Sequence, residues 1–89
     1  MAPTDIPTLF QCAICCRTLG FDRDALEYLD KVLELRPLHA DALAQRAVAL
    51  NTLKQPTAAI ESYKQALKIE PGHFDSLLGL AALQCQEGR

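Results

Sequence analysis

Three cysteines near the start of the chain have a spacing that could support metal or redox chemistry. Cys12, Cys15 and Cys16 include a C-x-x-C pair, the spacing found in many zinc and thiol–disulfide sites. A structural zinc ion needs four ligands, however, and the one remaining cysteine is Cys85, far along the chain. A disulfide between Cys12 and Cys16 is disfavoured, because Cβ atoms four residues apart on a helix lie about 5–6 Å apart. We therefore expect reduced cysteines that serve as small buried apolar residues, no metal site, and a reducing compartment.

Two histidines recur at matching places, each two residues after a proline. His39 follows Pro37 and His73 follows Pro71, so the pair could hold a metal ion. No carboxylate or cysteine recurs beside them, and we favour a role as loop residues that lead into the next helix. The sequence also lacks a glycine-rich phosphate loop, a nucleophile motif and a recurrent carboxylate pair. We expect neither catalysis nor a cofactor.

Composition points to a small all-α domain. Apolar residues make up 49% of the 89 residues but aromatic residues only 6%, which favours closely packed helices of Ala and Leu. Nine basic and eleven acidic residues give a net charge of −2, which argues against nucleic-acid binding by a basic surface. No apolar run approaches the roughly 18 residues that span a bilayer, and the first five residues do not resemble a secretory signal. We expect a soluble, cytoplasmic chain without membrane insertion.

The chain repeats itself with a period of 34 residues. Pro71 follows Pro37 by that interval, and most apolar positions between them have a counterpart one period away. The matched sets are Leu9, Leu43 and Leu77; Ala13, Ala47 and Ala81; Ala25 and Ala59; Leu29 and Tyr63; Leu33 and Leu67. Within each unit the apolar residues fall at helical spacing, which predicts two helices closed by proline.

The central unit resembles a tetratricopeptide repeat, on the matching positions Leu43, Ala47, Leu50, Ala59, Tyr63, Ala66 and Pro71. The resemblance implies an all-α solenoid of antiparallel helix pairs that form a right-handed superhelix. We expect one domain over residues 1–89, with repeat one at 6–39, repeat two at 40–73 and a half repeat at 74–89, five helices in all. The half repeat fits either a terminal capping helix or a chain cut from a longer array.

Helix ends can be predicted from local residue types. We expect Asp5 and Asp22 to cap the first two helices and Gly20 to end the first one. For the fourth helix, Gln55 or Thr57 is the expected cap.

The resemblance also implies a concave groove, lined by the first helix of each unit, that binds peptides. The matching positions are Phe10, Ile14, Arg17 and Thr18, then Ala44, Val48, Asn51 and Thr52, then Leu78 and Ala82. Phe10, Ile14, Val48 and Leu78 lie off the stripes that pair the helices, so they have no obvious partner and indicate binding or self-association. We expect a scaffold that binds a protein or peptide. The alternatives are a homodimer through the groove or last helix, and a scaffold part of a longer enzyme or regulator.

Two departures from the family pattern bear on binding. Members that grip the carboxylate tails of chaperones use Lys, Asn and Arg at set positions, and these positions hold Phe10, Ile14, Gln45, Val48, Asp75 and Gly79 in this chain. That clamp is therefore absent. Arg46 stands where the motif has a buried aliphatic residue, and it either pairs with an acidic residue of a neighbouring helix or packs its stem while its head reaches water. We prefer the second of these roles, a packed stem with its head in water, to a ligand contact.

Overall fold

Five helices make up the chain in a computed structural model that describes residues 5–87. Residues 1–4, where a signal sequence was not expected, and residues 88–89, the predicted end of the half repeat, lie outside the described range. The helices are α1 (Ile6–Thr18), α2 (Asp22–Leu35), α3 (Ala40–Thr52), α4 (Pro56–Ile69) and α5 (Phe74–Glu87). No strand occurs between residues 5 and 87, and the all-α prediction is confirmed.

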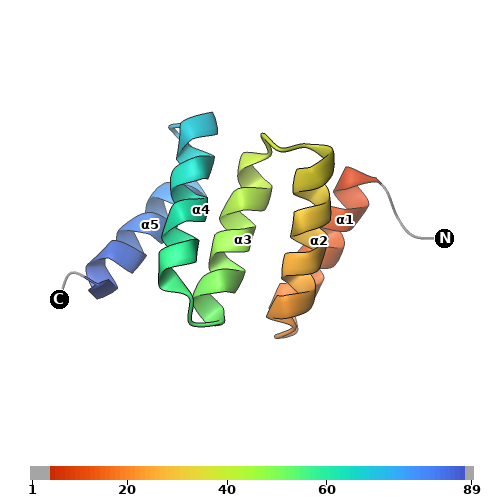
Figure 1. Ribbon diagram of the computed structural model, residues 1–89, viewed down its shortest axis with the longest axis horizontal. Coiled ribbons are helices and arrows are strands. Elements are labelled where there is room, and N and C mark those ends of the chain that lie inside the picture. Colours follow the sequence, from red (N-terminus) through yellow and green to blue (C-terminus); the bar gives the residue numbers. More distant parts are fainter. Residues whose placement is uncertain (1–4, 88–89) are drawn as a thin grey trace.

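The helices form a short, elongated stack of 47 × 26 × 16 Å. Each helix packs against the next in sequence, and α3 also contacts both α1 and α5. In Figure 1, α1 lies behind α2 and α5 lies behind α4, with α3 between the two pairs. The first helices α1, α3 and α5 therefore form one layer, and α2 and α4 form a second layer, each packed against the first helices before and after it in sequence.

Small residues let the helices approach closely. Ala47, Ala59 and Ala66 are fully buried at the α3–α4 contact, and Ala13 and Ala25 take the equivalent places between α1 and α2. Around them pack the larger core residues Leu9, Leu29, Val32, Leu43, Leu50, Tyr63 and Leu83. Burying each of these leucines contributes about 1.5–3 kcal/mol, so the repeated apolar stripe is the main source of stability.

Both helix pairs turn through the same hydrogen-bonded motif. After α1, Gly20 has φ of 92°, and the Phe21 N–H donates to the Cys16 carbonyl at 2.7 Å. After α3, Lys54 takes the equivalent place with φ of 66°, and the Gln55 N–H donates to the Leu50 carbonyl at 2.9 Å. A left-handed residue followed by this bond is a Schellman motif. The expected role of Gly20 is confirmed, and Lys54 performs it with a side chain that disfavours the conformation.

The predicted N-terminal caps are wrong in detail. Asp5 lies at the N-cap of α1 but accepts from the Thr8 hydroxyl at 2.7 Å instead of from a backbone amide. Asp22 is the first residue inside α2, with Phe21 at the N-cap, and Gln55 precedes α4 without a capping bond from its side chain. Thr57 lies within α4, past the capping position. The negative charges of Asp22 and Asp24 in the first turn of α2 still stabilise the helix through their interaction with its dipole.

The two histidines cap the helices that follow them. His39 Nδ1 accepts the Ala42 N–H at 3.0 Å at the start of α3. His73 Nδ1 accepts the Ser76 N–H at 3.2 Å at the start of α5, and its Nε2 lies 2.5 Å from Asp41 Oδ1 on α3. His73 therefore ties the beginning of α5 to the beginning of α3, a role beyond the one that its place in the sequence predicted.

Replacing Lys54 by Gly is expected to raise the free energy of unfolding by about 0.5–1 kcal/mol. Left-handed backbone costs an L-residue about 1–2 kcal/mol, and glycine removes this cost. The greater freedom of glycine in the unfolded chain offsets part of the resulting increase in stability. Urea unfolding followed by circular dichroism would measure the change. The matched control is Lys64→Gly, at an exposed position in the middle of α4. This change should lower the free energy of unfolding by about 1 kcal/mol. If Lys54→Gly and Lys64→Gly destabilised the chain equally, the claim that the backbone is strained at Lys54 would be wrong.

Candidate interaction surfaces

The predicted binding residues come together on the row of first helices. Since α1 contacts α3 and α3 contacts α5, residues at matching places on these helices form one continuous surface. We define the first-helix surface as seven residues that are exposed or half-buried: Phe10, Ile14, Arg17, Val48, Asn51, Leu78 and Ala82. Leu78 is the most exposed of its large apolar side chains, at 56%.

Three of the predicted residues are more buried than expected. Ala44 is 2% exposed in the core beside Leu83, so the structure places it beneath the first-helix surface. Phe10 packs against the Leu9 cluster and its ring lies 5.4 Å from that of His39, between centroids. Val48 packs against the α3–α4 core. The expectation that Phe10 and Val48 have no burial partner is therefore wrong, and Leu78 is the least covered of the four apolar residues.

Polar groups lie at one end of the first-helix surface. Arg17 Nε on α1 donates to Gln45 Oε1 on α3 at 2.8 Å, which links the first two first helices. Thr18 and Thr52 donate their hydroxyls to carbonyls of their own helices, at 2.8 and 3.1 Å. Within the described residues, the terminal nitrogens of Arg17 have no protein partner, and the Asn51 side chain is exposed. These two side chains can donate to a ligand.

Tyr63 on α4 is buried against α5. Its ring passes beside Gly79 on α5, where an added Cβ would overlap the ring and hydroxyl. Burial raises the pKa of Tyr63, while the positive charge of Arg17 lowers it and the negative charge of Asp75 raises it. From the sequence, Tyr63 was expected to serve helix pairing alone, although a glycine inside a predicted helix was a signal that a neighbouring side chain needs the space.

Arg46 makes structural contacts. Its Nε lies 3.1 Å from Asp30 Oδ1 on α2, and a terminal nitrogen donates to the buried Ser62 hydroxyl on α4 at 3.1 Å. The structure therefore adopts the pairing with an acidic residue of a neighbouring helix, and the preferred expectation, a packed stem whose head reaches water, is wrong. Because one side chain joins α2, α3 and α4, Arg46 fixes the two helix pairs relative to each other.

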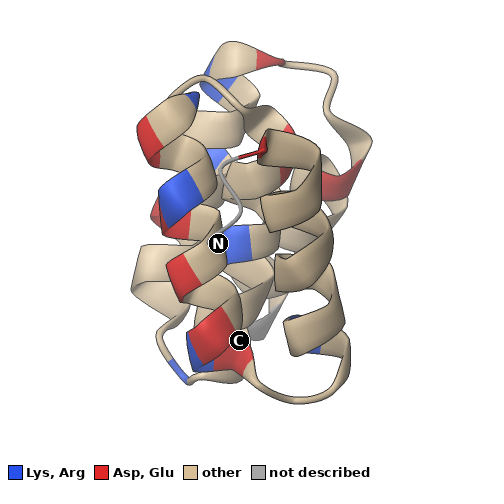
Figure 2. Cartoon of the chain, turned by 90° about the vertical axis from the view of Figure 1, so that its right-hand side faces the viewer, with Lys and Arg blue, Asp and Glu red and all other residues tan. Residues whose placement is uncertain are grey.

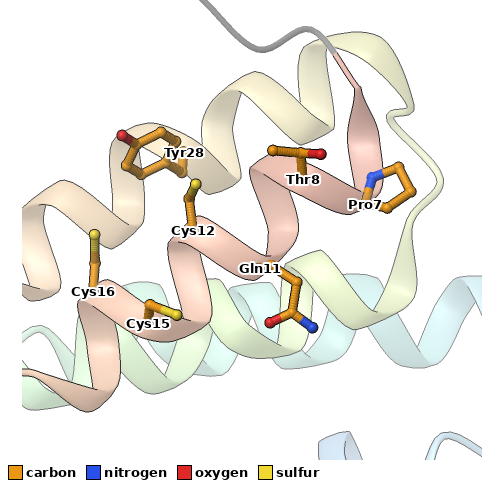
Figure 3. A pocket seen from close by; sticks show the side chains of 7 residues that line it. All are labelled: Pro7, Thr8, Gln11, Cys12, Cys15, Cys16 and Tyr28. Carbon is orange, nitrogen blue, oxygen red and sulfur yellow. The ribbon is translucent and has the colours of Figure 1, made fainter.

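The cysteine cluster lies at the opposite end of the stack from α5. A hollow of about 500 Å³ is lined by Pro7, Thr8, Gln11, Cys12, Cys15, Cys16 and Tyr28. Figure 3 shows Cys12 and Cys16 on the side of α1 toward Tyr28 of α2, whereas Cys15 projects elsewhere. Cys12 and Cys16 are half-buried and Cys15 is exposed, so the prediction that the cluster is buried filler is wrong.

The geometry of this hollow gives no support for thiol chemistry. Burial raises the pKa of Cys16, and Asp24, Cys12 and Cys15 add to the increase, which disfavours the reactive thiolate. No group of three or more potential metal ligands is found in the part of the chain that the structure describes. Two of its lining residues, Thr8 and Cys15, match Ala42 and Ala49 of α3, which are fully buried.

Charge is unevenly divided between the two kinds of helix. Figure 2 shows α1 almost free of charged residues and α2 rich in both signs. Arg17 is the one charged residue within α1, and α2 carries Asp22, Arg23, Asp24, Glu27, Asp30, Lys31 and Glu34. No described helix has the length and apolar character needed to cross a membrane. The first helices thus present the less charged surface, which suits contact with apolar ligand groups.

Comparison with known proteins supports the repeat assignment. The model of the tetratricopeptide repeat matches residues 18–74, well over half of the chain. No curated protein matches. Among solved structures, the crystal structure of MamA superposes with a TM-score of 0.89 at 18% identity, over 96% of this chain and 50% of that one. The chain therefore spans about half the length of that relative.

Two further structures are similar. The first TPR of Spaghetti (RPAP3), bound to the HSP90 peptide SRMEEVD, has a TM-score of 0.89 at 18% identity, over 98% of this chain and 69% of that one. Another structure of MamA has a TM-score of 0.82 at 26% identity, over 98% of this chain and 50% of that one. Proteins of this fold are generally interaction modules without catalysis. The matched family model, the five-helix stack and these structural neighbours together show that the chain belongs to the tetratricopeptide repeat family.

Proposed function

We propose that the chain is an interaction scaffold whose first-helix surface binds a short peptide or helix of another protein. The observation that carries the proposal is the apolar band of Phe10, Ile14, Val48 and Leu78, which crosses all three first helices and is only partly covered. Exposed apolar residues that gather on one surface are candidates for protein binding. Arg17 and Asn51 at its end supply donors that would orient a bound backbone.

A peptide-display library screened against the wild-type chain tests this proposal. Peptides that bind the first-helix surface should bind Leu78→Asp at least about tenfold more weakly, a loss of roughly 1.4 kcal/mol. Because Leu78 is 56% exposed, the variant should remain folded. The matched control is Leu38→Asp on the α2–α3 loop, where an even more exposed leucine, at 72%, receives the same charge. Equal binding to all three proteins would contradict the proposal.

The HSP90 peptide SRMEEVD is not expected to bind this chain measurably. The structural neighbour that holds this peptide is similar in fold, but the clamp positions here include Asp75 and Val48 in place of basic and amide side chains. An exposed aspartate repels the acidic residues of the peptide. Fluorescence anisotropy with labelled SRMEEVD, and a scrambled peptide as control, would measure this. Saturable binding that is lost in Arg17→Ala would show that Arg17 replaces the clamp.

Self-association is the second candidate, and the exposed apolar residues of α5 favour it. Leu77, Leu78 and Ala81 are all exposed. A second copy of the chain could therefore cover them in place of a foreign protein.

Free thiols at exposed Cys15 and Cys85 support a place in a reducing compartment such as the cytoplasm. Reductant is therefore needed in every binding measurement, to prevent cross-linking between copies.

A further inference from the structure

The charged side chains described on the first helices differ in whether the protein itself pairs them. They are Arg17 on α1, Asp41 and Arg46 on α3, and Asp75 on α5. Asp41 contacts His73 Nε2 at the start of α5, and Arg46 is paired with Asp30 of α2. Arg17 and Asp75 form no ion pair with any residue that the structure describes. One positive and one negative charge are therefore left for a ligand.

Arg17 and Asp75 belong to the face that carries the apolar band. Arg17 lies three residues after Ile14 on α1, and the two share one side of that helix. Asp75 lies three residues before Leu78 on α5, in the same relation, and is exposed. The Arg17 Nε donates to the neutral Gln45 amide oxygen at 2.8 Å, which leaves the positive charge uncompensated. Each charge thus lies beside an apolar side chain that a ligand residue can contact.

The two charges give the first-helix surface a positive and a negative end. Arg17 is in the last turn of α1 and Asp75 is in the first turn of α5, with α3 in contact with both helices. Asp41 stands one period before Asp75 in the sequence and adds negative charge in the first turn of α3. A ligand that runs from α1 to α5 therefore meets positive charge first and negative charge last.

We propose that the first-helix surface selects an extended peptide segment with an acidic residue for Arg17, a basic residue for Asp75 and apolar residues alone between them. This inference rests on the function proposed above and adds the charge pattern of the ligand. Neighbouring helix axes lie about 8–10 Å apart, and Arg17 reaches α3, so its charge and that of Asp75 are about 10–20 Å apart. An extended chain rises about 3.3 Å per residue, which places the two charged residues of the ligand about three to six positions apart.

The order of the charges also sets the direction in which the peptide binds. In the reverse direction its acidic residue would meet Asp75 and its basic residue would meet Arg17, and like charges repel. SRMEEVD contains both kinds of charge. However, a glutamate separates its arginine from every acidic residue three or more positions away. That glutamate would lie against the apolar band, which agrees with the expectation that this peptide does not bind.

Two synthetic peptide libraries with blocked ends test the proposal. In one, Asp is followed by a spacer of two to five apolar residues and then by Lys, and in the other Asp and Lys are exchanged. In reductant, peptides of one order should bind the wild-type chain at least about tenfold more tightly than those of the other. Their binding should fall at least about tenfold in Leu78→Asp, in Arg17→Glu and in Asp75→Lys. The double variant Arg17→Glu/Asp75→Lys should prefer the opposite library.

Controls separate binding from a structural role of the two charges. Lys64→Glu and Glu61→Lys reverse charges at exposed positions of α4 and should leave the preference between the libraries unchanged. Arg17 and Asp75 also lie where each favours the dipole of its own helix. Circular dichroism during urea unfolding therefore accompanies every binding measurement. If their reversal altered stability but not the preference between libraries, the charges would serve the helices alone and the proposal would be overturned.

The outcomes also distinguish this inference from the function on which it rests. Peptides from an unrestricted library that bind wild type but not Leu78→Asp, and that show neither charge order, would overturn the charge pattern and leave the scaffold function in place. Equal binding by the two charged libraries would have the same meaning. If no library yielded a peptide whose binding depends on Leu78, both the charge pattern and the proposed function would be wrong.

Discussion

Replacing Ala47 by Trp is expected to abolish cooperative folding. Ala47 is fully buried where α3 meets α4, in the cluster that holds Ala59, Tyr63 and Leu83. An indole at this place would force the two helices apart, and α5 would lose the surface formed by Tyr63. Overpacking usually costs about 1–3 kcal/mol, and this large substitution should exceed that range. A chain of this size is stabilised by only about 5–15 kcal/mol.

Circular dichroism during urea unfolding would measure this effect. The Ala47→Trp protein should lose helical signal or its sharp transition in urea. The matched control is Gln65→Trp, which adds the same indole to an exposed position of α4 and should change the free energy of unfolding by less than about 0.5 kcal/mol. Equal stability of the two variants would mean that the repeat has been placed in the wrong register.

Replacing His73 by Ala is expected to lower the free energy of unfolding by about 2–4 kcal/mol. The change removes the N-cap of α5, worth about 1 kcal/mol. It also leaves the fully buried Ser76 hydroxyl without its partner at 2.8 Å, at a further cost of about 1–3 kcal/mol. Contact with Asp41 across to α3 is lost as well. Hydrogen exchange should show the greatest loss of protection in α5.

Two variants separate the contributions of His73. His73→Asn keeps a good capping residue but cannot reach Asp41 in the same way, so its cost should be smaller. His39→Ala removes the equivalent cap of α3, where Ala42 has no hydroxyl and no acidic side chain of the described residues pairs with the ring. It should cost about 1 kcal/mol. If His39→Ala were as damaging as His73→Ala, the link between α3 and α5 would contribute little.

The helices were predictable because their signal is repeated. An apolar stripe at helical spacing occurs five times, and the 34-residue period places Leu9, Leu43 and Leu77 at equivalent sites. The proline after each second helix, together with Gly20 after α1, marks where helices end. Division of the chain into units at residues 39 and 73 stays a prediction, although α1, α3 and α5 begin one period apart.

Features that depend on contacts between helices could not be read in the same way. Arg46 has an acidic partner because Asp30 lies on the neighbouring helix, sixteen residues away in sequence. Asp22 does not cap α2, because the turn in which the Phe21 N–H donates to the Cys16 carbonyl places Phe21 at the N-cap. Residue type alone does not reveal this turn geometry. Cys15 matches the fully buried Ala49 of α3, yet it is exposed, because no helix precedes α1 within the described residues to cover it.

Prediction of the candidate site was limited by the same cause. Its residues were identified from matching places on the first helices, and contacts of α3 with α1 and α5 bring them together. Their burial depends on neighbours, however: Ala44 and Leu78 are equivalent in sequence, but α3 lies inside the stack and α5 at its end. Whether these residues bind a ligand stays a prediction that the variants above test.

The central claim is that the first-helix surface is available to a foreign partner. Light scattering of the wild-type chain in reductant, over a wide range of protein concentration, tests it most directly. A mass near 9.8 kDa at every concentration is the predicted result, because the surface is then unoccupied in solution. A stable dimer in wild type and Leu38→Asp that becomes a monomer in Leu78→Asp would contradict the claim, since the surface would already be filled by a second copy.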